Sequence, residues 1–314
     1  MLKRTGIILS AIMVLSVLSA IPGETEAKPP GAATWEVPGD FDTIQDAIDS
    51  DLVSDGDRIM VGPGEWFGAT VTKAVEIKGT GGAVIVDGPA HSSGWLHFGF
   101  QLGYGAGGDG ATISHFTFDC GAPSYTTPAL VFPVFSFDAD DVTVEHCTMN
   151  GALQGVTNWE GDGWTVEHNT LNGLATRNGG GIGIFCGSYS GATADDSTIR
   201  YNTVTGTLEV HAEDKGGYGG SGIVLYADYR WGKQGAEEIT GNEISHNRIS
   251  MISDNPDVVD FNAIELTESR DDPELEPVIF ENTIEKNDMR GSANGILLTP
   301  EDLGDCNDIS QNKF

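Results

Sequence analysis

The segments VTVEHCTM (residues 142–149) and WTVEHNTL (residues 164–171) repeat one pattern, and this pattern decides the fold. An aliphatic residue is followed by two variable residues, a small or polar residue, another variable residue and an apolar residue. Five more segments follow the pattern: ATISHFTF (111–118), STIRYNTV (197–204), NEISHNRI (242–249), NTIEKNDM (282–289) and NDISQNKF (307–314). Seven copies that agree in three columns indicate a repeat protein.

The spacing of the copies favours one repeat architecture. They lie about 22 to 45 residues apart, and the shortest interval fits one coil of a parallel β-helix with strands ~4.8 Å apart. Longer intervals are coils with inserted loops. A second strand signal, with period-2 alternation, follows several copies: GIGIF, GIVLY, AIELT and GILLT. We therefore expect an all-β, right-handed parallel β-helix.

Two other architectures fit the sequence less well. A helical or leucine-rich solenoid is disfavoured, because the units lack a 3.6-residue period and regularly spaced leucines. Two separate globular domains are disfavoured, because the repeat continues to residue 314.

The middle column of the repeat is rich in asparagine. It contains Phe116, Cys147, Asn169, Asn202, Asn247, Asn287 and Asn312. Stacked asparagine amides can hydrogen-bond from coil to coil and satisfy buried polar groups at a corner. The column therefore predicts a structural ladder, with Cys147 as a small buried free thiol. The other cysteines are Cys120, Cys186 and Cys306; an exported protein permits disulfides, and four cysteines allow three pairings.

The N-terminal residues have the features of a secretory signal. Lys3 and Arg4 precede an apolar stretch at residues 7–18, and cleavage is plausible after Ala20 or Ala27. We expect a signal peptide at 1–27, a linker at 28–34 and the β-helix at 35–314. The mature chain is then expected to lack a membrane span and to be secreted or held at the cell surface. An uncleaved anchor is the alternative.

The segment WEVPGDFDTIQDAIDS (35–50) predicts one short helix. Asp42 or Thr43 is suited to the N-cap, and Ile44, Ala47 and Ile48 then share one helical face. Such a helix would cover the otherwise exposed end of the first coil.

The chain is strongly acidic, with a net charge of −31 from 47 acidic and 16 basic residues. Nucleic acid is an unfavourable partner, because its recognition needs a basic surface. Three explanations of the acidity remain open: adaptation to high salt or solubility, calcium binding by clustered carboxylates, and repulsion of polyanionic surfaces.

The opening of the repeat resembles that of a known superfamily. The segments VPGDFDTIQDAID (37–49), GDRIMVGPGEW (56–66), VEIKG (75–79) and VIVDG (84–88) are similar to the start of pectin-lyase-like β-helix proteins. That superfamily includes pectin methylesterases, pectate lyases, polygalacturonases, alginate-modifying epimerases and periplasmic copper-processing proteins. The resemblance extends from Trp35 onward and implies the fold, but many activities share this architecture.

The motifs of individual enzyme families are missing from the sequence. It contains no Gly-His-Gly or Arg-Ile-Lys of the polygalacturonase type, no Asp-Phe-Ile-Phe-Gly of the esterases and no Asp-Pro-His of the epimerases. The resemblance therefore assigns no catalytic residue.

An aspartate column precedes the first aliphatic position of the repeat by four residues. Its members are Asp109, Asp140, Asp162, Asp195 and Asp305. One interpretation is structural, with each carboxylate accepting backbone N–H bonds in a turn. The other is a calcium site, because carboxylates stacked one coil apart repel unless a cation lies between them. The candidate metal ligands are Asp140, Asp141 and Asp162, with calcium as the candidate cofactor.

The stretch HAEDKGGYGGSGIVLYADYRWGKQGAEE (211–238) gathers basic and aromatic residues in an acidic chain. Aromatic faces stack on sugar rings, and cations pair with uronate carboxylates or act as a base. The candidate catalytic residues are Lys215, Arg230 and His211. The candidate substrate-binding residues are Arg177, Tyr226, Tyr229 and Trp231. A solvated loop that covers the side of the β-helix is the simpler alternative.

These features favour a secreted protein that interacts with an extracellular polysaccharide or cell-surface glycan. If it is an enzyme, we expect a polysaccharide lyase-like or glycoside hydrolase-like reaction. The main alternative is a non-catalytic surface or structural protein. A periplasmic metal-handling protein is a weaker alternative, because the six methionines and seven histidines are scattered.

Overall fold

The computed structural model describes residues 32–105, 107–124, 126–177, 180–216, 219–229, 237–270 and 276–314. Residues Ala32–Phe314 form one compact unit. The predicted signal peptide (1–27) and the first four residues of the predicted linker (28–34) lie outside the described residues. None of the helices in the described part is both long and apolar enough to cross a membrane.

The strands of the described residues form three all-parallel sheets, named here A, B and C. Sheet A contains β1 (Thr34–Val37), β2 (Arg58–Val61), β5 (Glu76–Gly79), β8 (Thr112–Ser114), β11 (Thr143–Glu145), β14 (Thr165–Glu167), β17 (Thr198–Arg200), β20 (Glu243–Ser245), β23 (Thr283–Glu285) and β25 (Asp308–Ser310). Sheet B contains β3 (Gly64–Phe67), β6 (Ala83–Asp87), β9 (Thr117–Asp119), β12 (Thr148–Ala152), β15 (Thr170–Thr176), β18 (Thr203–Val210) and β21 (Arg248–Ser253). Sheet C contains β4 (Ala69–Val71), β7 (Leu96–Gly103), β10 (Ala129–Phe137), β13 (Gln154–Trp159), β16 (Ile182–Ser188), β19 (Gly220–Ala227), β22 (Phe261–Glu268) and β24 (Asn294–Thr299).

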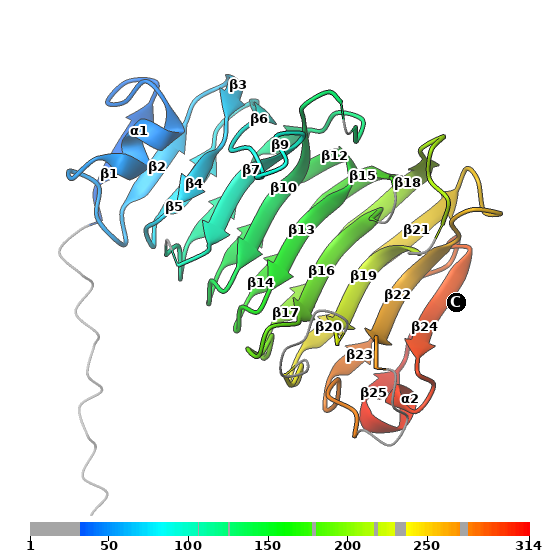
Figure 1. The fold of residues 1–314 in the computed structure, drawn as a ribbon. Coiled ribbons are helices and arrows are strands. Elements are labelled where there is room, and N and C mark those ends of the chain that lie inside the picture. The colour runs from blue at the N-terminus through cyan, green and yellow to red at the C-terminus, as the bar shows by residue number, and fades with distance from the viewer. Residues whose placement is uncertain are drawn as a thin grey trace, which may run out of the picture. The chain divides into compact units, whose positions relative to one another are not determined.

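The chain passes through the sheets in the order A, B, C and then begins the next coil, so the strands of each sheet stack in sequence order (Figure 1). This is a right-handed parallel β-helix and confirms the predicted fold. The register is the one that the repeat predicts: Val144 pairs with Ile113 on one side and with Val166 on the other. These aliphatic side chains point inward and form a continuous buried core along the coils.

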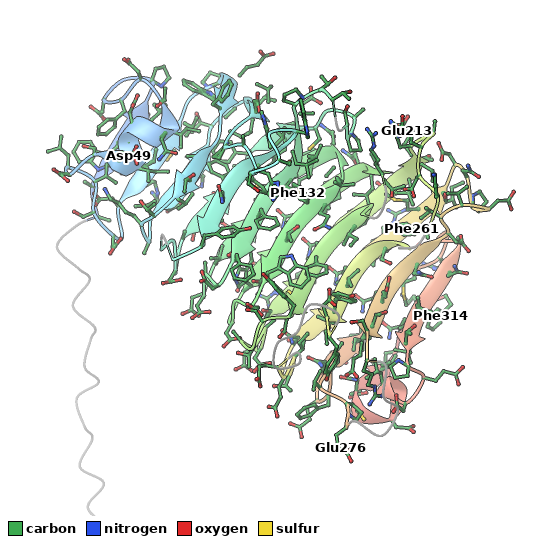
Figure 2. All side chains as sticks on the ribbon, viewed as in Figure 1. Asp49, Phe132, Glu213, Phe261, Glu276 and Phe314 are labelled. Atoms are coloured by element: carbon green, nitrogen blue, oxygen red, sulfur yellow. The ribbon has the colours of Figure 1, made fainter. Side chains whose placement is uncertain are left out.

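The first coil is covered by the predicted helix, α1 (Ile44–Asp49). The Thr43 hydroxyl caps it by accepting the backbone N–H of Asp46 at 3.0 Å. Ile44, Ala47 and Ile48 are fully buried, as the apolar spacing predicts. Figure 2 shows Asp49 on this helix, at the N-terminal end of the coils.

A second helix, α2 (Leu303–Cys306), was not predicted. It is a single turn, too short to produce a helical period in the sequence. Its one buried residue, Leu303, packs into the core near the last coil.

The asparagine column forms the predicted ladder, the Asn ladder, at the corner from sheet A to sheet B. The Asn202 carboxamide oxygen accepts the backbone N–H of Asn169 at 3.0 Å and its Nδ2–H at 3.1 Å. The Asn202 Nδ2 group donates to the Val166 carbonyl at 2.8 Å and to Oδ1 of Asn247 at 3.1 Å. The same contacts continue through Asn247, Asn287 and Asn312. The buried amides of the ladder, from Asn169 to Asn287, thereby have protein partners for both their oxygen and their N–H groups.

Cys147 ends the Asn ladder toward the N-terminus. It is buried, and its backbone N–H donates to Oδ1 of Asn169 at 2.9 Å. All four cysteines are free thiols, which agrees with the core-filling interpretation of Cys147. Burial raises the pKa of the Cys147 thiol to about 12, so it stays protonated.

A second asparagine column, at the entrance to sheet A, was missed in the sequence. Oδ1 of Asn242 accepts the backbone N–H of Ser197 at 2.9 Å. Asn282 and Asn307 repeat this contact in the next two coils. In these coils, amide ladders therefore lie at both ends of the sheet A strands.

Candidate functional site

The outer face of sheet C carries aromatic residues where the other strand faces are mostly polar. In the register of the sheet, Phe137 pairs with Trp159, Trp159 with Gly187, and Gly187 with Tyr226. Aliphatic residues fill the alternating inward positions, such as Val134, Val156 and Ile184. The outward rings form two small apolar clusters outside the core, and Phe132, on the face shown in Figure 2, belongs to one of them.

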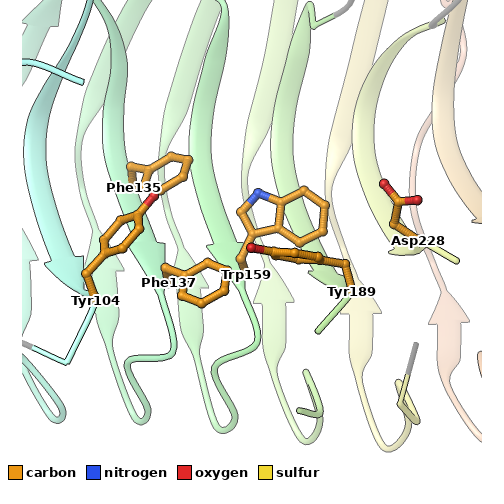
Figure 3. Close-up of a pocket in the computed structure, with 6 residues that line it drawn as sticks. All are labelled: Tyr104, Phe135, Phe137, Trp159, Tyr189 and Asp228. Carbon is orange, nitrogen blue, oxygen red and sulfur yellow. The ribbon is translucent and has the colours of Figure 1, made fainter. Parts of the chain in front are cut away.

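A groove of about 420 Å³ runs over this aromatic face. It is lined by Tyr104, Phe135, Phe137, Trp159, Tyr189 and Asp228. Figure 3 shows Tyr104, Phe135 and Phe137 at one end, Trp159 and Tyr189 in the middle, and Asp228 beyond them. Because these residues lie on or just after β7, β10, β13, β16 and β19, the groove crosses five successive coils.

The rings in the groove hold one another in place. The ring centroids of Tyr104 and Phe137 are 5.3 Å apart, and those of Trp159 and Tyr189 are 5.2 Å apart in an edge-to-face arrangement. The ring centroids of Trp159 and Tyr226, which lie on either side of strand β16, are 6.2 Å apart. Gly187 makes this approach possible, because a Cβ there would lie 2.6 Å from the Phe185 ring and 2.8 Å from the Tyr226 carbonyl oxygen.

A buried carboxylate positions the Tyr189 loop. Glu160 accepts the backbone N–H groups of Tyr189 (2.9 Å) and Ser190, and also the Ser190 hydroxyl at 2.6 Å. Burial, and then the charge of Glu160, raise the pKa of Tyr189. Burial, Tyr189 and Asp138 likewise raise the pKa of Tyr104. Both phenols therefore stay protonated at neutral pH and can donate hydrogen bonds to a ligand in the groove.

Asp228 is the acid that lines the far end of the groove. It is almost fully buried, and its Oδ1 lies 3.1 Å from the Ser269 hydroxyl, which donates to it. Glycoside hydrolysis uses a pair of carboxyl groups on either side of the scissile bond. Among the described residues that line the groove, Asp228 is the only carboxylate.

The sequence-predicted catalytic residues do not lie in this groove where the structure describes them. His211 and Lys215 precede β19, in the turn from sheet B to sheet C, whereas the groove lies at the other end of that strand. The ends of β19 are about 23 Å apart, from the usual strand rise. Arg230 lies outside the described residues.

The predicted substrate-binding residues separate into two places. Arg177 lies beside His211, where its guanidinium forms an ion pair with Glu213. Tyr226 is on the outer face of sheet C next to Trp159, and Tyr229 follows β19. Trp231 lies outside the described residues. Of the predicted binding residues that the structure describes, only Tyr226 packs against a ring that lines the groove, that of Trp159.

A second, smaller cavity of about 230 Å³ lies at the turn from sheet B to sheet C. His211 lines it together with Glu209 and Asp254. The Nδ1 atom of His211 accepts the backbone N–H of Glu213 at 3.2 Å, which orients the ring. Catalytic roles for His211, Lys215 and Arg230 remain predictions.

Four members of the aspartate column, Asp109, Asp140, Asp162 and Asp195, form a second ladder, the Asp ladder. The fifth predicted member, Asp305, lies in α2 instead. Oδ1 of Asp140 accepts the backbone N–H of Asp162 at 2.9 Å, and Oδ1 of Asp162 accepts that of Asp195 at 2.7 Å. Asp109 and Asp195 make the same bond to the coil that follows each of them. The carboxylates thus accept backbone N–H bonds, as the structural interpretation predicts, although the partner lies in the next coil.

The candidate calcium ligands belong to this ladder and its neighbour. Asp141 adopts a left-handed conformation (φ 55°) and donates its backbone N–H to the Asp162 carbonyl at 2.8 Å. Within the described residues, no group of three or more His, Cys, Asp or Glu side chains is arranged to hold a metal ion. Calcium binding by Asp140, Asp141 and Asp162 remains a prediction.

The groove residues were missed in the sequence because they are far apart in it. Tyr104, Phe137, Trp159 and Tyr189 lie in different coils with loops of unequal length between them. Only the register of sheet C brings them into line. The available signal was the FPVFSF segment (132–137) followed by NWE (158–160), with aromatic residues at the end of two successive strands.

The comparisons with known proteins do not assign an activity to this chain. No protein-family model and no curated protein matches the sequence. The chain is similar to an alginate lyase from Paenibacillus sp. str. FPU-7, with 13% identity and a TM-score of 0.42 over 90% of this chain and 99% of that chain. A tailspike protein of Acinetobacter baumannii bacteriophage Fri1, described as a capsular polysaccharide depolymerase, is 10% identical with a TM-score of 0.35, covering 90% of this chain and 61% of that chain.

The A-module of a mannuronan C-5 epimerase from Azotobacter vinelandii is 18% identical with a TM-score of 0.32, covering 90% of this chain and 95% of that chain. Identities and TM-scores this low transfer no activity to the present chain. The fold and the groove define its class: a right-handed parallel β-helix protein with an aromatic groove on one sheet.

Proposed function

We propose that this protein is exported and binds an extracellular polysaccharide along the aromatic groove of sheet C. The observation that carries the proposal is the row of Tyr104, Phe137, Trp159 and Tyr189 across successive coils. Aromatic rings offer rigid apolar faces on which sugar rings stack, while the phenol groups donate hydrogen bonds. A groove that continues from coil to coil suits a linear polymer better than a compact ligand.

Glycan binding by the groove is better supported than glycan cleavage. The groove lining described here has a single carboxylate, Asp228, whereas hydrolysis uses two. A lyase-like reaction with His211, Lys215 or Arg230 as base would have to take place outside the described part of the groove. This lining therefore favours a non-catalytic surface protein that holds a glycan, and a polysaccharide-cleaving enzyme is the second candidate function.

The test is a binding screen of the mature protein against neutral and uronate polysaccharides, by isothermal titration calorimetry or affinity gel electrophoresis. We expect Trp159→Ala with Tyr189→Ala to weaken binding by about tenfold or more, since each ring contributes roughly 1 kcal/mol. Phe67→Ala is the matched control, because Phe67 is 62% exposed and lies on sheet B.

Three results bear on the proposal. Wild-type binding that is lost in the double variant and kept in Phe67→Ala supports it. Equal binding by both variants, or no binding to any polymer of the panel, contradicts it. Release of reducing ends or unsaturated products in the same samples separates an enzyme from a binding protein.

A further inference from the structure

A second ordered feature of the surface lies at the corner between sheets A and B, away from the groove. Its rings, the imidazole column, stack along the coils and belong to His115, His146, His168, Tyr201 and His246. Successive ring centroids are 5.0, 5.0, 5.1 and 5.2 Å apart, so the column repeats with the spacing of the coils. All five residues are exposed.

The backbone at this corner does not by itself select histidine. Each residue of the column has a left-handed φ between 53° and 63°, a conformation that glycine or asparagine adopts at lower cost. The same corner position is taken by Lys286 (φ 57°) and Gln311 (φ 55°) in the last coils. Four of the seven histidines in the chain nevertheless occupy it.

The column lies in a part of the surface where acids outnumber bases less than elsewhere in the chain. The cations along this corner of sheets A and B are Arg58, Lys78, Arg200, Arg248, Lys286, Arg290 and Lys313. The acids are Glu36, Glu65, Glu76, Asp119, Glu145, Glu167, Glu243, Glu285, Asp288 and Asp308. Several are already paired, such as Glu76 with Arg58 and Glu167 with Arg200. Ten acids face seven bases at this corner, whereas the whole chain has about three acids for each base.

Protonation of the imidazoles would therefore reverse the local charge. Partial burial, followed by the charges of Lys78 and His146, lowers the pKa of His115, while Glu145 and Glu76 oppose this shift. An unperturbed imidazole titrates near about 6.5. Protonation of all four histidines places four positive charges in a line, beside acids of which some, such as Glu167 and Glu285, already have cationic partners.

The ring geometry argues against a chelated metal. His146 and His168 are parallel within 5°, so their nitrogen lone pairs point side by side and do not converge on one ion. Within the described residues, no cluster of potential metal ligands includes these rings.

We propose that the imidazole column is a second binding site, which holds a linear carboxylated polysaccharide along the coils when the histidines are protonated. A linear polymer that follows the coils runs along the column, so its carboxylates lie near several imidazolium groups. Arg200, whose guanidinium lies 5.8 Å from the Tyr201 ring centroid, is paired with Glu167, so the tyrosine position adds no free charge to the column. Threonines that begin the sheet B strands, such as Thr148 and Thr170, provide hydroxyl groups on one side of the column, whereas Glu145 and Glu167 border it on the other.

The experiment measures the affinity for polygalacturonate at pH 5.5 and pH 7.5, in low salt with a chelator present. We expect wild type to bind about tenfold more tightly at pH 5.5, the gain from several exposed ion pairs acting together. His146→Gln with His168→Gln should remove most of the difference, because only His115 and His246 remain to be protonated; the chain already accepts glutamine at this corner in Gln311. A neutral glucan should bind equally at both pH values.

A second variant keeps the proposal open to refutation if the glutamine variant is unstable. His146→Lys with His168→Lys supplies permanent charge in a residue that this corner also accepts, as in Lys286. It should bind polygalacturonate at pH 7.5 as tightly as wild type binds at pH 5.5. Melting temperatures at both pH values verify that each variant is folded.

Two outcomes would overturn the proposal: binding that does not depend on pH in wild type, or pH dependence that is undiminished in the glutamine variant. The groove variant Trp159→Ala with Tyr189→Ala should retain the pH-dependent component. The two sites can therefore fail independently.

Discussion

The two ladders of this molecule use the same hydrogen bond with opposite electrostatics. In the Asn ladder, a side-chain oxygen accepts a backbone N–H of the neighbouring coil at 2.9–3.0 Å. In the Asp ladder, a carboxylate oxygen accepts the same kind of donor at 2.5–3.0 Å. The first ladder is neutral and buried, whereas the second is charged and lies at the surface between sheets C and A.

The difference shows what each corner can tolerate. An amide both accepts and donates, so Asn202 satisfies its two neighbours and the Val166 carbonyl at once in a dry corner. A carboxylate only accepts, and its neighbours one coil away repel it. Burial, together with Asp162, Asp109 and Asp141, raises the pKa of Asp140 against the effect of its bond from Asp162. Solvent at that corner screens the repulsion between the carboxylates and lowers its cost.

The largest effect is expected when the two chemistries are exchanged at the buried corner. Asn202→Asp places a carboxylate against the Val166 carbonyl and Oδ1 of Asn247, which have lost their donor. We expect unfolding free energy at pH 7 to fall by about 3–5 kcal/mol, the cost of an uncompensated buried charge. Urea denaturation measures it, and part of the loss should return at pH 4 as the carboxyl is protonated. An equal loss at both pH values would show that charge is not the cause.

A smaller loss is expected from removing the amide without adding charge. Asn202→Leu leaves the Asn169 N–H, the Val166 carbonyl and Oδ1 of Asn247 with fewer partners. We expect a destabilisation of about 1–3 kcal/mol. Asn172→Leu is the matched control, because Asn172 is an exposed asparagine on sheet B. If both changes cost the same by chemical denaturation, the buried ladder has no special role.

The opposite exchange at the surface corner should be mildly stabilising. Burial and the neighbouring Asp162 also raise the pKa of Asp195, so the folded state takes up these protons before the unfolded chain does. The contribution of Asp140 and Asp195 to stability therefore increases as the pH falls from 7 through their native pKa, and levels off below the unfolded value of about 3.9.

Asp140→Asn with Asp195→Asn removes this dependence. At pH 7 we expect the variant to be more stable than wild type by up to about 1 kcal/mol, a small effect because both carboxylates are partly solvated. Near pH 4 the two proteins should converge. A variant that is less stable than wild type at pH 7 would mean that the charge strengthens the ladder.

Calcium is expected to have the smallest effect. If Asp140, Asp141 and Asp162 bind it, millimolar calcium should relieve the repulsion and raise the melting temperature by about 2–4 °C, equivalent to roughly 1 kcal/mol in a domain of this size. Magnesium is the control cation, and Asp140→Asn with Asp162→Asn should abolish the shift. An unchanged melting curve would limit the Asp ladder to backbone hydrogen bonding.

The fold was predictable because its signal is local and repeated. The column of Asn169, Asn202 and Asn247 occurs at the same place in each copy, whatever the length of the loops between them. Helix α1 was predictable from its cap at Thr43 and the spacing of Ile44, Ala47 and Ile48. The second asparagine column was overlooked because it is complete in only three coils, at Asn242, Asn282 and Asn307.

The groove was not predictable from the same sequence. Trp159 and Tyr189 become neighbours only through the register of sheet C, which variable loops conceal. The composition of the 211–238 stretch showed that basic and aromatic residues are concentrated there, but it did not show where in the fold each of them lies. Strand β19 runs through its middle and puts His211 and Tyr226 at opposite ends.

Both ladders allow the number of coils in the chain to change. The oxygen of each rung accepts a backbone N–H, and every coil offers that donor whatever its side chains are. A whole coil can therefore be duplicated or deleted in the gene without changes to the sequences of the neighbouring coils. An insertion or deletion of a few residues at a ladder position, in contrast, breaks the hydrogen bonds to both neighbouring coils. The differences in length between coils fall between the ladders, as the unequal intervals between the repeat copies show. We expect related proteins to differ in the number of complete coils and in loop length, while the ladder residues keep their place in each coil.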